Sequence, residues 1–158
     1  MKAIKFFTTL FSLVLLVSVN ADAQTDAKRK KEFNLNSDGI GIKGYDPVAY
    51  FTQNKAVKGS SSNAVYYSGV TYYFSSAANK ELFKANPAKY EPQYGGWCAY
   101  AMGDDGSKVS IDPSTFKVLN GKLYLFYNSW GNNTLKKWNK NEVVLKQAAD
   151  KNWQALYR

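Results

Sequence analysis

The chain has 158 residues, no histidine, a single cysteine and a formal net charge of +9. Without histidine it cannot form a Ser-His-Asp triad, a Cys-His catalytic pair or a metal site with imidazole ligands. A single cysteine also excludes an internal disulfide and a CxxC redox pair.

The first 23 residues have the pattern of a secretory signal peptide. Two lysines precede an uncharged apolar run at 6–19, and Ala21 and Ala23 supply the A-x-A pattern of a cleavage site. The run is shorter than the roughly 20 residues of a membrane-spanning helix. We expect cleavage after Ala23 and export to the periplasm or the medium. A lipid anchor is not expected, because Cys98 lies far from the cleavage site.

Residues 24–37 are polar and contain the basic run 28–31, a composition too poor in apolar groups to offset the entropy of ordering. The sequence therefore predicts a flexible basic linker, followed by one soluble domain over 38–158 with no transmembrane segment. The basic run is a candidate contact to an anionic envelope surface. Export argues against nucleic acid as a partner.

A first β-hairpin is predicted at residues 65–74. Its β-rich runs, 65–67 and 70–74, flank Ser68-Gly69, and a two-residue loop with glycine is typical of tight hairpins. Strand periodicity places three of its side chains on one face: Val70, Tyr72 and Phe74.

A helix is predicted next, over residues 77–85, with Ser75 or Ser76 as its N-cap. Asn86-Pro87 ends it, because proline disfavours a helical conformation at the residue before it. Helical spacing puts three residues on an apolar stripe: Ala78, Leu82 and Ala85.

A second hairpin is predicted around Asn120-Gly121, the pair that type I′ turns prefer. The runs 116–119 and 122–127 flank it. The resulting register pairs apolar residues across the strands: Phe116 with Leu125, and Val118 with Leu123.

The C-terminal region reads as two helices separated at 139–141. The apolar residues of these helices are Leu135 and Trp138 in the first, and Leu145, Ala148, Ala149, Trp153 and Leu156 in the second. Hairpins and helices without β-α-β alternation predict an α+β fold, in which a small antiparallel sheet of hairpins packs with helices.

Cys98 allows two interpretations. It is a candidate soft ligand for Cu(I), with Met102 four residues later, or a thiol for redox chemistry. The favoured interpretation is a small buried side chain between Trp97 and Ala99, since free cysteines are usually buried and no lysine or arginine adjoins Cys98 in the sequence to stabilise a thiolate.

Carboxylates are the remaining route to acid–base catalysis, and a hydrolase is therefore an alternative function. The candidates are Asp46, Asp104, Asp105, Asp112 and Glu91. Asp46 and Asp112 each precede a proline, a pattern that is also typical of turns, and Asp104-Asp105 falls in a polar loop.

Four motifs follow one another along the chain: Gly44–Phe51, Gly69–Ser76, Phe83 with Asn86–Tyr90, and Tyr94–Ala99. Together they resemble the YHS-domain family, and most closely its exported bacterial branch. The resemblance is strongest from about residue 44 to 99 and implies a YHS-like fold.

YHS domains are suspected of binding metal, notably beside copper-handling proteins, so the resemblance makes copper a candidate cofactor, and the sequence itself identifies none. Where the metal-associated branch carries cysteines, this chain has Ala49, Ser75 and Asn79. Tyr73 stands about where the histidine of the family name falls. The resemblance thus leaves Cys98 as the remaining candidate ligand.

Turn-forming and small residues predict a ligand pocket where two segments of the chain meet. The candidate binding residues are Tyr45, Asp46, Pro47, Tyr94, Gly95, Gly96, Trp97 and Cys98. Hydroxyl groups among the 12 tyrosines suit a glycan or a small polar ligand. We therefore predict an exported, non-enzymatic module that binds a small molecule, a glycan or a metal.

Overall fold

The computed structural model describes residues 24–157, so the predicted signal peptide lies outside the described residues. The helices are 24–32, η1 Ile42–Gly44, α2 Ala49–Thr52, α3 Ala77–Ala85, α4 Pro87–Tyr90, η2 Gln93–Gly96, α5 Ala99–Asp104, α6 Thr134–Trp138 and α7 Glu142–Tyr157. The strands are β1 Ser60–Tyr67, β2 Val70–Phe74, β3 Asp112–Leu119, β4 Lys122–Phe126, β5 Asn128–Ser129 and β6 Asn132–Asn133.

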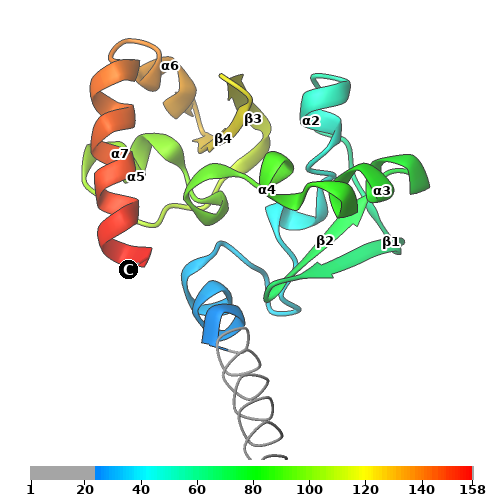
Figure 1. Ribbon diagram of the computed structural model, residues 1–158. Coiled ribbons are helices and arrows are strands. Elements are labelled where there is room, and N and C mark those ends of the chain that lie inside the picture. The colour runs from blue at the N-terminus through cyan, green and yellow to red at the C-terminus, as the bar shows by residue number, and fades with distance from the viewer. Residues whose placement is uncertain (1–23, 158) are drawn as a thin grey trace, which may run out of the picture.

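The fold is α+β, as the sequence predicts. Within residues 24–157 the strands form three separate antiparallel pairs, β1–β2, β3–β4 and β5–β6. Figure 1 shows β1, β2 and α3 on one side of the molecule and α5, α6 and α7 on the other, with β3, β4 and α4 between them.

Both predicted hairpins are confirmed, and the second has its predicted register. Phe116 pairs with Leu125 and Val118 with Leu123 across β3 and β4. In each hairpin the two-residue loop has positive φ at both positions, which is the left-handed geometry of a type I′ turn. The third hairpin, β5–β6, was not predicted, because its strands are two residues each and lack β-favouring side chains.

Helix α3 has the predicted bounds, and Ser76 caps it by accepting a hydrogen bond from the Asn79 amide at 3.1 Å. The predicted apolar stripe of Ala78, Leu82 and Ala85 is wrong. Those three residues are exposed, and the face turned inward carries Asn79 and Phe83. The Phe83 ring buries more apolar area than alanine or leucine, and this decides the rotation of the helix.

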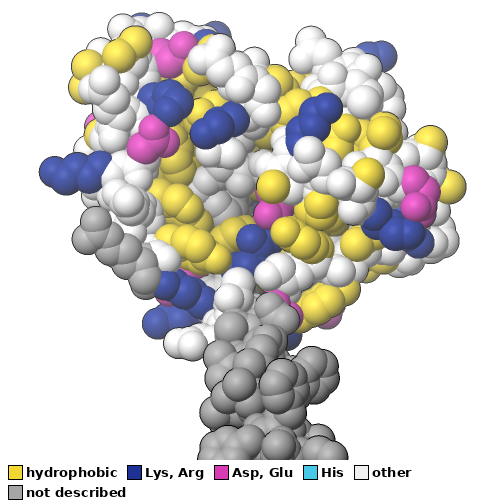
Figure 2. Space-filling view, in the orientation of Figure 1, with side chains coloured by type: hydrophobic (Ala, Val, Ile, Leu, Met, Phe, Trp, Pro, Cys, Tyr) yellow, Lys and Arg dark blue, Asp and Glu magenta, His cyan; other side chains and the backbone are white. Residues whose placement is uncertain are grey.

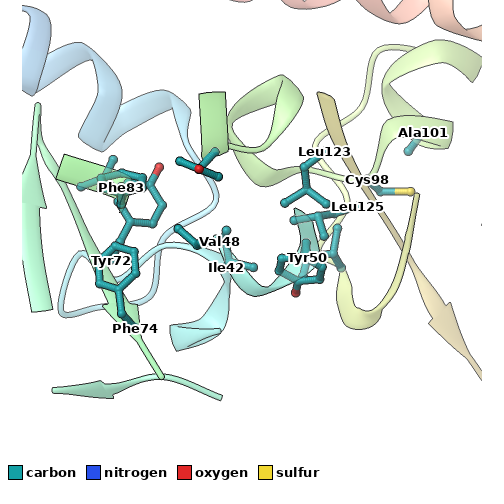
Figure 3. Close-up of a cluster of buried hydrophobic side chains, with 13 residues drawn as sticks. Ile42, Val48, Tyr50, Tyr72, Phe74, Phe83, Cys98, Ala101, Leu123 and Leu125 are labelled. Carbon is teal, nitrogen blue, oxygen red and sulfur yellow. The ribbon is translucent and has the colours of Figure 1, made fainter. Parts of the chain in front are cut away.

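The core consists of two clusters that share strand β4. Leu123 and Leu125 point into one cluster, and Tyr124 and Phe126 point into the other. Figure 3 shows the first cluster: Tyr72, Phe74 and Phe83 lie on one side, Leu123, Leu125 and Cys98 on the other, and Ile42, Val48 and Tyr50 between them. Alternating side chains therefore bury both faces of β4 and join the two halves of the molecule.

The predicted break between the C-terminal helices is confirmed, since α6 ends at Trp138 and α7 begins at Glu142. Helix α7 packs along α5. On its apolar side Ala149 is buried and Leu145 and Trp153 are half-buried, whereas Leu156 is exposed.

The N-terminal segment differs from the flexible linker that the sequence predicts. Residues 24–32 are helical, and the Arg29 guanidinium forms an ion pair with Glu91. Its Nε donates to the Ser68 carbonyl at 2.6 Å, and its guanidinium carbon lies 4.3 Å from the centre of the Phe33 ring. Composition alone underestimates how well such a segment is ordered. Here a charged residue is held in place by stacking of its planar guanidinium on a ring and by a nearly buried ion pair.

Candidate functional site

The first predicted binding segment is organised around Asp46, whose side chain is completely buried. Its Oδ1 accepts hydrogen bonds from the amides of Val48 at 2.8 Å and Ala49 at 3.3 Å. Its Oδ2 accepts from the Ser75 amide at 2.8 Å, the Ser75 hydroxyl at 2.7 Å and the Asn79 carboxamide at 2.7 Å. One carboxylate thus joins the start of α2, the end of β2 and the first turn of α3.

These five hydrogen bonds occupy the carboxylate, and no buried side-chain nitrogen or oxygen within residues 24–157 lacks a partner. Beside Asp46, Pro47 is buried, and the half-buried ring of Tyr45 lies 4.7 Å from the Lys58 ammonium. The arrangement stabilises the fold and leaves this carboxylate no surface at which to meet a substrate.

The second predicted binding segment holds two helices in place. The Tyr94 hydroxyl donates to Asp150 of α7 at 2.8 Å, and the Trp97 indole nitrogen donates to the Glu32 carbonyl at 2.7 Å. Burial, together with the hydrogen bond to Asp150, raises the pKa of Tyr94 far above its usual value.

Gly95 is required in this segment for a physical reason. Its φ is +59°, and a Cβ at this position would come within 2.8 Å of the Trp153 ring and 2.9 Å of the Phe33 ring. Gly96 follows with φ +84°, and its carbonyl accepts a hydrogen bond from the Asn34 carboxamide at 3.0 Å. The two predicted segments therefore have different partners: Asp46 binds β2 and α3, whereas 94–97 binds the N-terminal segment and α7.

Cys98 is completely buried at the start of α5. Its sulfur accepts a hydrogen bond from the Tyr127 amide at 3.3 Å and lies 3.4 Å from the Thr134 hydroxyl. Met102 is equally buried but belongs to the second core cluster, whereas Cys98 belongs to the first. The two sulfur-containing side chains therefore pack in different clusters of the core.

A hollow of about 350 Å³, which we call the Tyr100 hollow, opens above Cys98. Half-buried Tyr100 and Tyr127 line it, and Asp104, Asp105 and Lys137 stand exposed at its rim. Helix α5 supplies one wall, and the segment from the end of β4 to α6 supplies the other.

The rim charges of this hollow are not neutralised by the protein. Within residues 24–157, Asp104, Asp105 and Lys137 form no ion pair. The Lys137 ammonium lies 5.7 Å from the centre of the Tyr100 ring. Hydrogen bonds from Ser107 hold the pKa of Asp105 below its ordinary value, so this carboxylate is charged at neutral pH. Burial, followed by the charge of Asp104, raises the pKa of Tyr100.

The sequence marks Asp104-Asp105 only as a polar loop, and the hollow was missed. Lys137 and Tyr127 come from distant positions in the chain, so no local spacing connects them with the two aspartates. The only local signal is the alternation of small and aromatic residues around Tyr100.

A family model of the YHS domain matches residues 48–94. This chain contains a YHS domain. The match covers α2, β1, β2, α3 and α4 and ends at Tyr94 in η2. No curated protein and no solved structure matches the chain significantly.

The YHS domain brings together the three positions at which the family resemblance places cysteines. Ala49, Ser75 and Asn79 all donate hydrogen bonds to the Asp46 carboxylate. They contribute amide, hydroxyl and carboxamide groups, which are poor ligands for a soft metal such as Cu(I).

A metal centre does not fit the residues present. Within 24–157 there is no group of three or more Cys, His, Asp or Glu side chains that could hold an ion. The Cys98 sulfur contacts the Tyr127 amide and the Thr134 hydroxyl, and Met102 packs in the other core cluster. Cys98 and Met102 are therefore core residues.

The Tyr100 hollow lies beyond the residues that match the YHS model, on α5 and the segments around α6.

No helix within residues 24–157 has the length and apolar character needed to cross a membrane. Figure 2 shows Lys and Arg side chains scattered among Asp and Glu over one face of the molecule, without a single basic patch on that face.

Proposed function

We propose that this chain is an exported, non-enzymatic binding module that takes a small polar molecule with a cationic amino group in the Tyr100 hollow. The observation that carries the proposal is the pair of carboxylates, Asp104 and Asp105, which stand outside any ion pair of residues 24–157 at the rim of an aromatic hollow.

Charge favours an amine at this position. The whole chain carries a formal charge of +9, yet the rim of the hollow has two carboxylates against one ammonium. An amino group donates charge-assisted hydrogen bonds to carboxylates, which are about twice as strong as neutral ones. Tyr100 and Tyr127 line the hollow, and aromatic rings attract cations.

The other groups of the hollow suit a ligand that also carries hydroxyl groups. Asn132 stands at the rim, and its carboxamide makes no hydrogen bond within the described residues. A hydroxylated amine gives this carboxamide and the Lys137 ammonium partners of their own. An amino sugar carries both kinds of group.

The proposal includes no catalytic activity because Asp46 and Asp112, the two aspartates that precede prolines, already have hydrogen-bond partners. Asp46 is buried under five hydrogen bonds, and Asp112 accepts from the Ser114 amide and the Thr115 hydroxyl, both at 2.9 Å. Both aspartates thus serve as turn formers, and the chain has no histidine to act as a base. Export is supported by the signal-peptide pattern of residues 1–23.

Calorimetric titration with D-glucosamine, L-arginine and putrescine tests the proposal, with D-glucose as the uncharged match for glucosamine. We expect at least one amine to bind more tightly than glucose. The double variant Asp104→Asn with Asp105→Asn is expected to weaken amine binding about tenfold or more, because two charged acceptors are lost.

Asp38→Asn is the matched control, because Asp38 is an exposed aspartate far along the chain from the hollow. It is expected to bind like the unaltered protein. Equal affinity of the double variant, or equal binding of glucose and glucosamine, contradicts the proposal.

A further inference from the structure

Trp130 is the most exposed large hydrophobic side chain among residues 24–157. It is 99% exposed at the tip of the β5–β6 hairpin, whereas tryptophan is highly buried on average in folded proteins. Its neighbours on the hairpin are polar: Asn128, Ser129, Asn132 and Asn133.

The backbone at this tip disfavours tryptophan. Trp130 and Gly131 have φ of +50° and +78°, nearly the same as the +51° and +72° of Asn120 and Gly121 in the β3–β4 turn. Asparagine suits this left-handed position, whereas a bulky side chain is strained there. The chain thus places asparagine in one such turn and an unfavourable, exposed tryptophan in the other, and retained strain of this kind is typical of functional positions.

A second hollow, of about 460 Å³, lies beside Trp130, and we call it the Trp130 hollow. Its charged groups already have partners: the Lys43 ammonium donates to the Ile111 carbonyl at 2.6 Å, and Asp112 accepts from Ser114 and Thr115. The charged groups of this hollow therefore do not favour a charged ligand.

The remaining polar groups of the Trp130 hollow are neutral and available. The hydroxyls of Ser110 and Ser129 make no hydrogen bond within the described residues. The Asn128 carboxamide uses its NH₂ to donate to the Thr115 hydroxyl at 3.0 Å, which leaves its oxygen as an acceptor.

We propose that Trp130 and the Trp130 hollow bind a pyranose ring of a neutral glycan. The indole offers a flat apolar face for the C–H face of the sugar, while the hydroxyls of Ser110 and Ser129 and the oxygen of Asn128 bond the sugar hydroxyls. A lipid surface fits less well, because the hairpin around Trp130 carries asparagine and serine instead of further apolar side chains. This site is separate from the Tyr100 hollow, although Tyr127 lines both.

The test uses protein from the full-length chain, with chitohexaose and cellohexaose as neutral probes in calorimetric titration. We expect one of them to bind. Trp130→Asn is expected to weaken binding about tenfold or more while its melting temperature stays equal or rises, because asparagine relieves the turn. Trp130→Phe keeps an aromatic face and is expected to stay within a few-fold of the unaltered protein.

Leu82→Asn is the matched control, since Leu82 is an exposed apolar residue, 44% accessible, on α3. It is expected to leave glycan binding unchanged. Three results would overturn the inference: neither hexasaccharide binds, Trp130→Asn binds as tightly as the unaltered protein, or tryptophan fluorescence shifts with phosphatidylcholine vesicles and not with sugars. Each of these outcomes leaves amine binding at the Tyr100 hollow unaffected.

Discussion

Asp46 shows how a single side chain connects elements that the chain keeps apart. Its carboxylate accepts hydrogen bonds from the start of α2, the end of β2 and the first turn of α3. The Asp-Pro sequence predicts the turn, but only the structure gives the partners Ser75 and Asn79. Those partners lie 29 and 33 residues away, beyond the reach of local turn rules.

Asp46→Asn tests this role. The asparagine keeps the size of the side chain but loses the charge and turns an NH₂ group toward existing donors. We expect the free energy of unfolding to fall by about 3 kcal/mol, since buried charge-assisted hydrogen bonds are lost and donors are left unpaired. Urea denaturation measures it, with Asp38→Asn as the control. A loss below about 1 kcal/mol would show that the network is dispensable.

Cys98 is expected to behave as a core residue. Its sulfur is completely buried and receives a hydrogen bond from the Tyr127 amide. A thiol reagent such as DTNB should therefore react slowly with the native protein and rapidly in denaturant, because only unfolding brings the thiolate into solvent. Rapid stoichiometric reaction under native conditions would instead support thiol chemistry at Cys98.

At the scale of elements, Glu142 joins α7 to its surroundings. It lies in the first turn of α7, forms an ion pair with Lys117 of β3, and accepts a hydrogen bond from the Trp138 indole at 2.9 Å. The hydrogen bond from Lys117 holds the pKa of Glu142 below its ordinary value of 4.5. A carboxylate at a helix N-terminus also benefits from the helix dipole.

The sign of the resulting pH dependence follows from the lowered pKa. The stability contributed by Glu142 is fully present above pH 4.5 and is lost as the pH falls through the lower pKa of the folded state. Glu142→Gln should therefore be less stable than the unaltered protein at neutral pH, and this difference should shrink below pH 4.5. Urea midpoints across the acid range measure it. A difference independent of pH would mean that the charge of Glu142 contributes nothing.

Elements with strong local signals could be predicted from the sequence. Asn120-Gly121 fixes both the turn and the register of β3 and β4, and Asn86-Pro87 ends α3 and starts α4. The buried face of α3 could not be predicted, because the choice between Leu82 and Phe83 depends on the rings of Tyr72 and Phe74 against which the helix packs.

At the scale of the molecule, the YHS domain is completed by segments outside its own match. Leu123, Leu125 and Ile111 fill the core cluster of the YHS residues, and the N-terminal segment packs against both halves. Phe33 contacts Trp153 and Tyr157 of α7, with ring centres 5.9 and 5.8 Å apart, while Arg29 reaches Ser68 and Glu91.

Arg29→Ala tests whether this N-terminal segment is part of the folded unit. The substitution leaves Glu91 nearly buried without its cation, beside the Tyr72 hydroxyl that donates to it at 2.7 Å. We expect a loss of about 3 kcal/mol in the free energy of unfolding. Lys31→Ala, an exposed residue of the same helix, should change it by less than about 0.5 kcal/mol. Equal small losses would restore the view of this segment as a linker.

The candidate site could be predicted less well than the fold. Composition excludes triads and histidine-ligated metals, and it leaves a binding role open. The Tyr100 hollow, however, combines Asp104 and Asp105 with Lys137 from a distant segment. Such convergence depends on how α5 and α6 pack, and no spacing rule gives it.

The most direct test of the central claim is an NMR titration of backbone amides with D-glucosamine, with D-glucose as the comparison. We predict that glucosamine shifts the amides of Tyr100, Asp104, Asp105 and Lys137 and that glucose leaves these four amides unshifted. Shifts centred on Asp46 or on 94–97, or no shifts at millimolar glucosamine, would contradict the assignment of the Tyr100 hollow as the binding site.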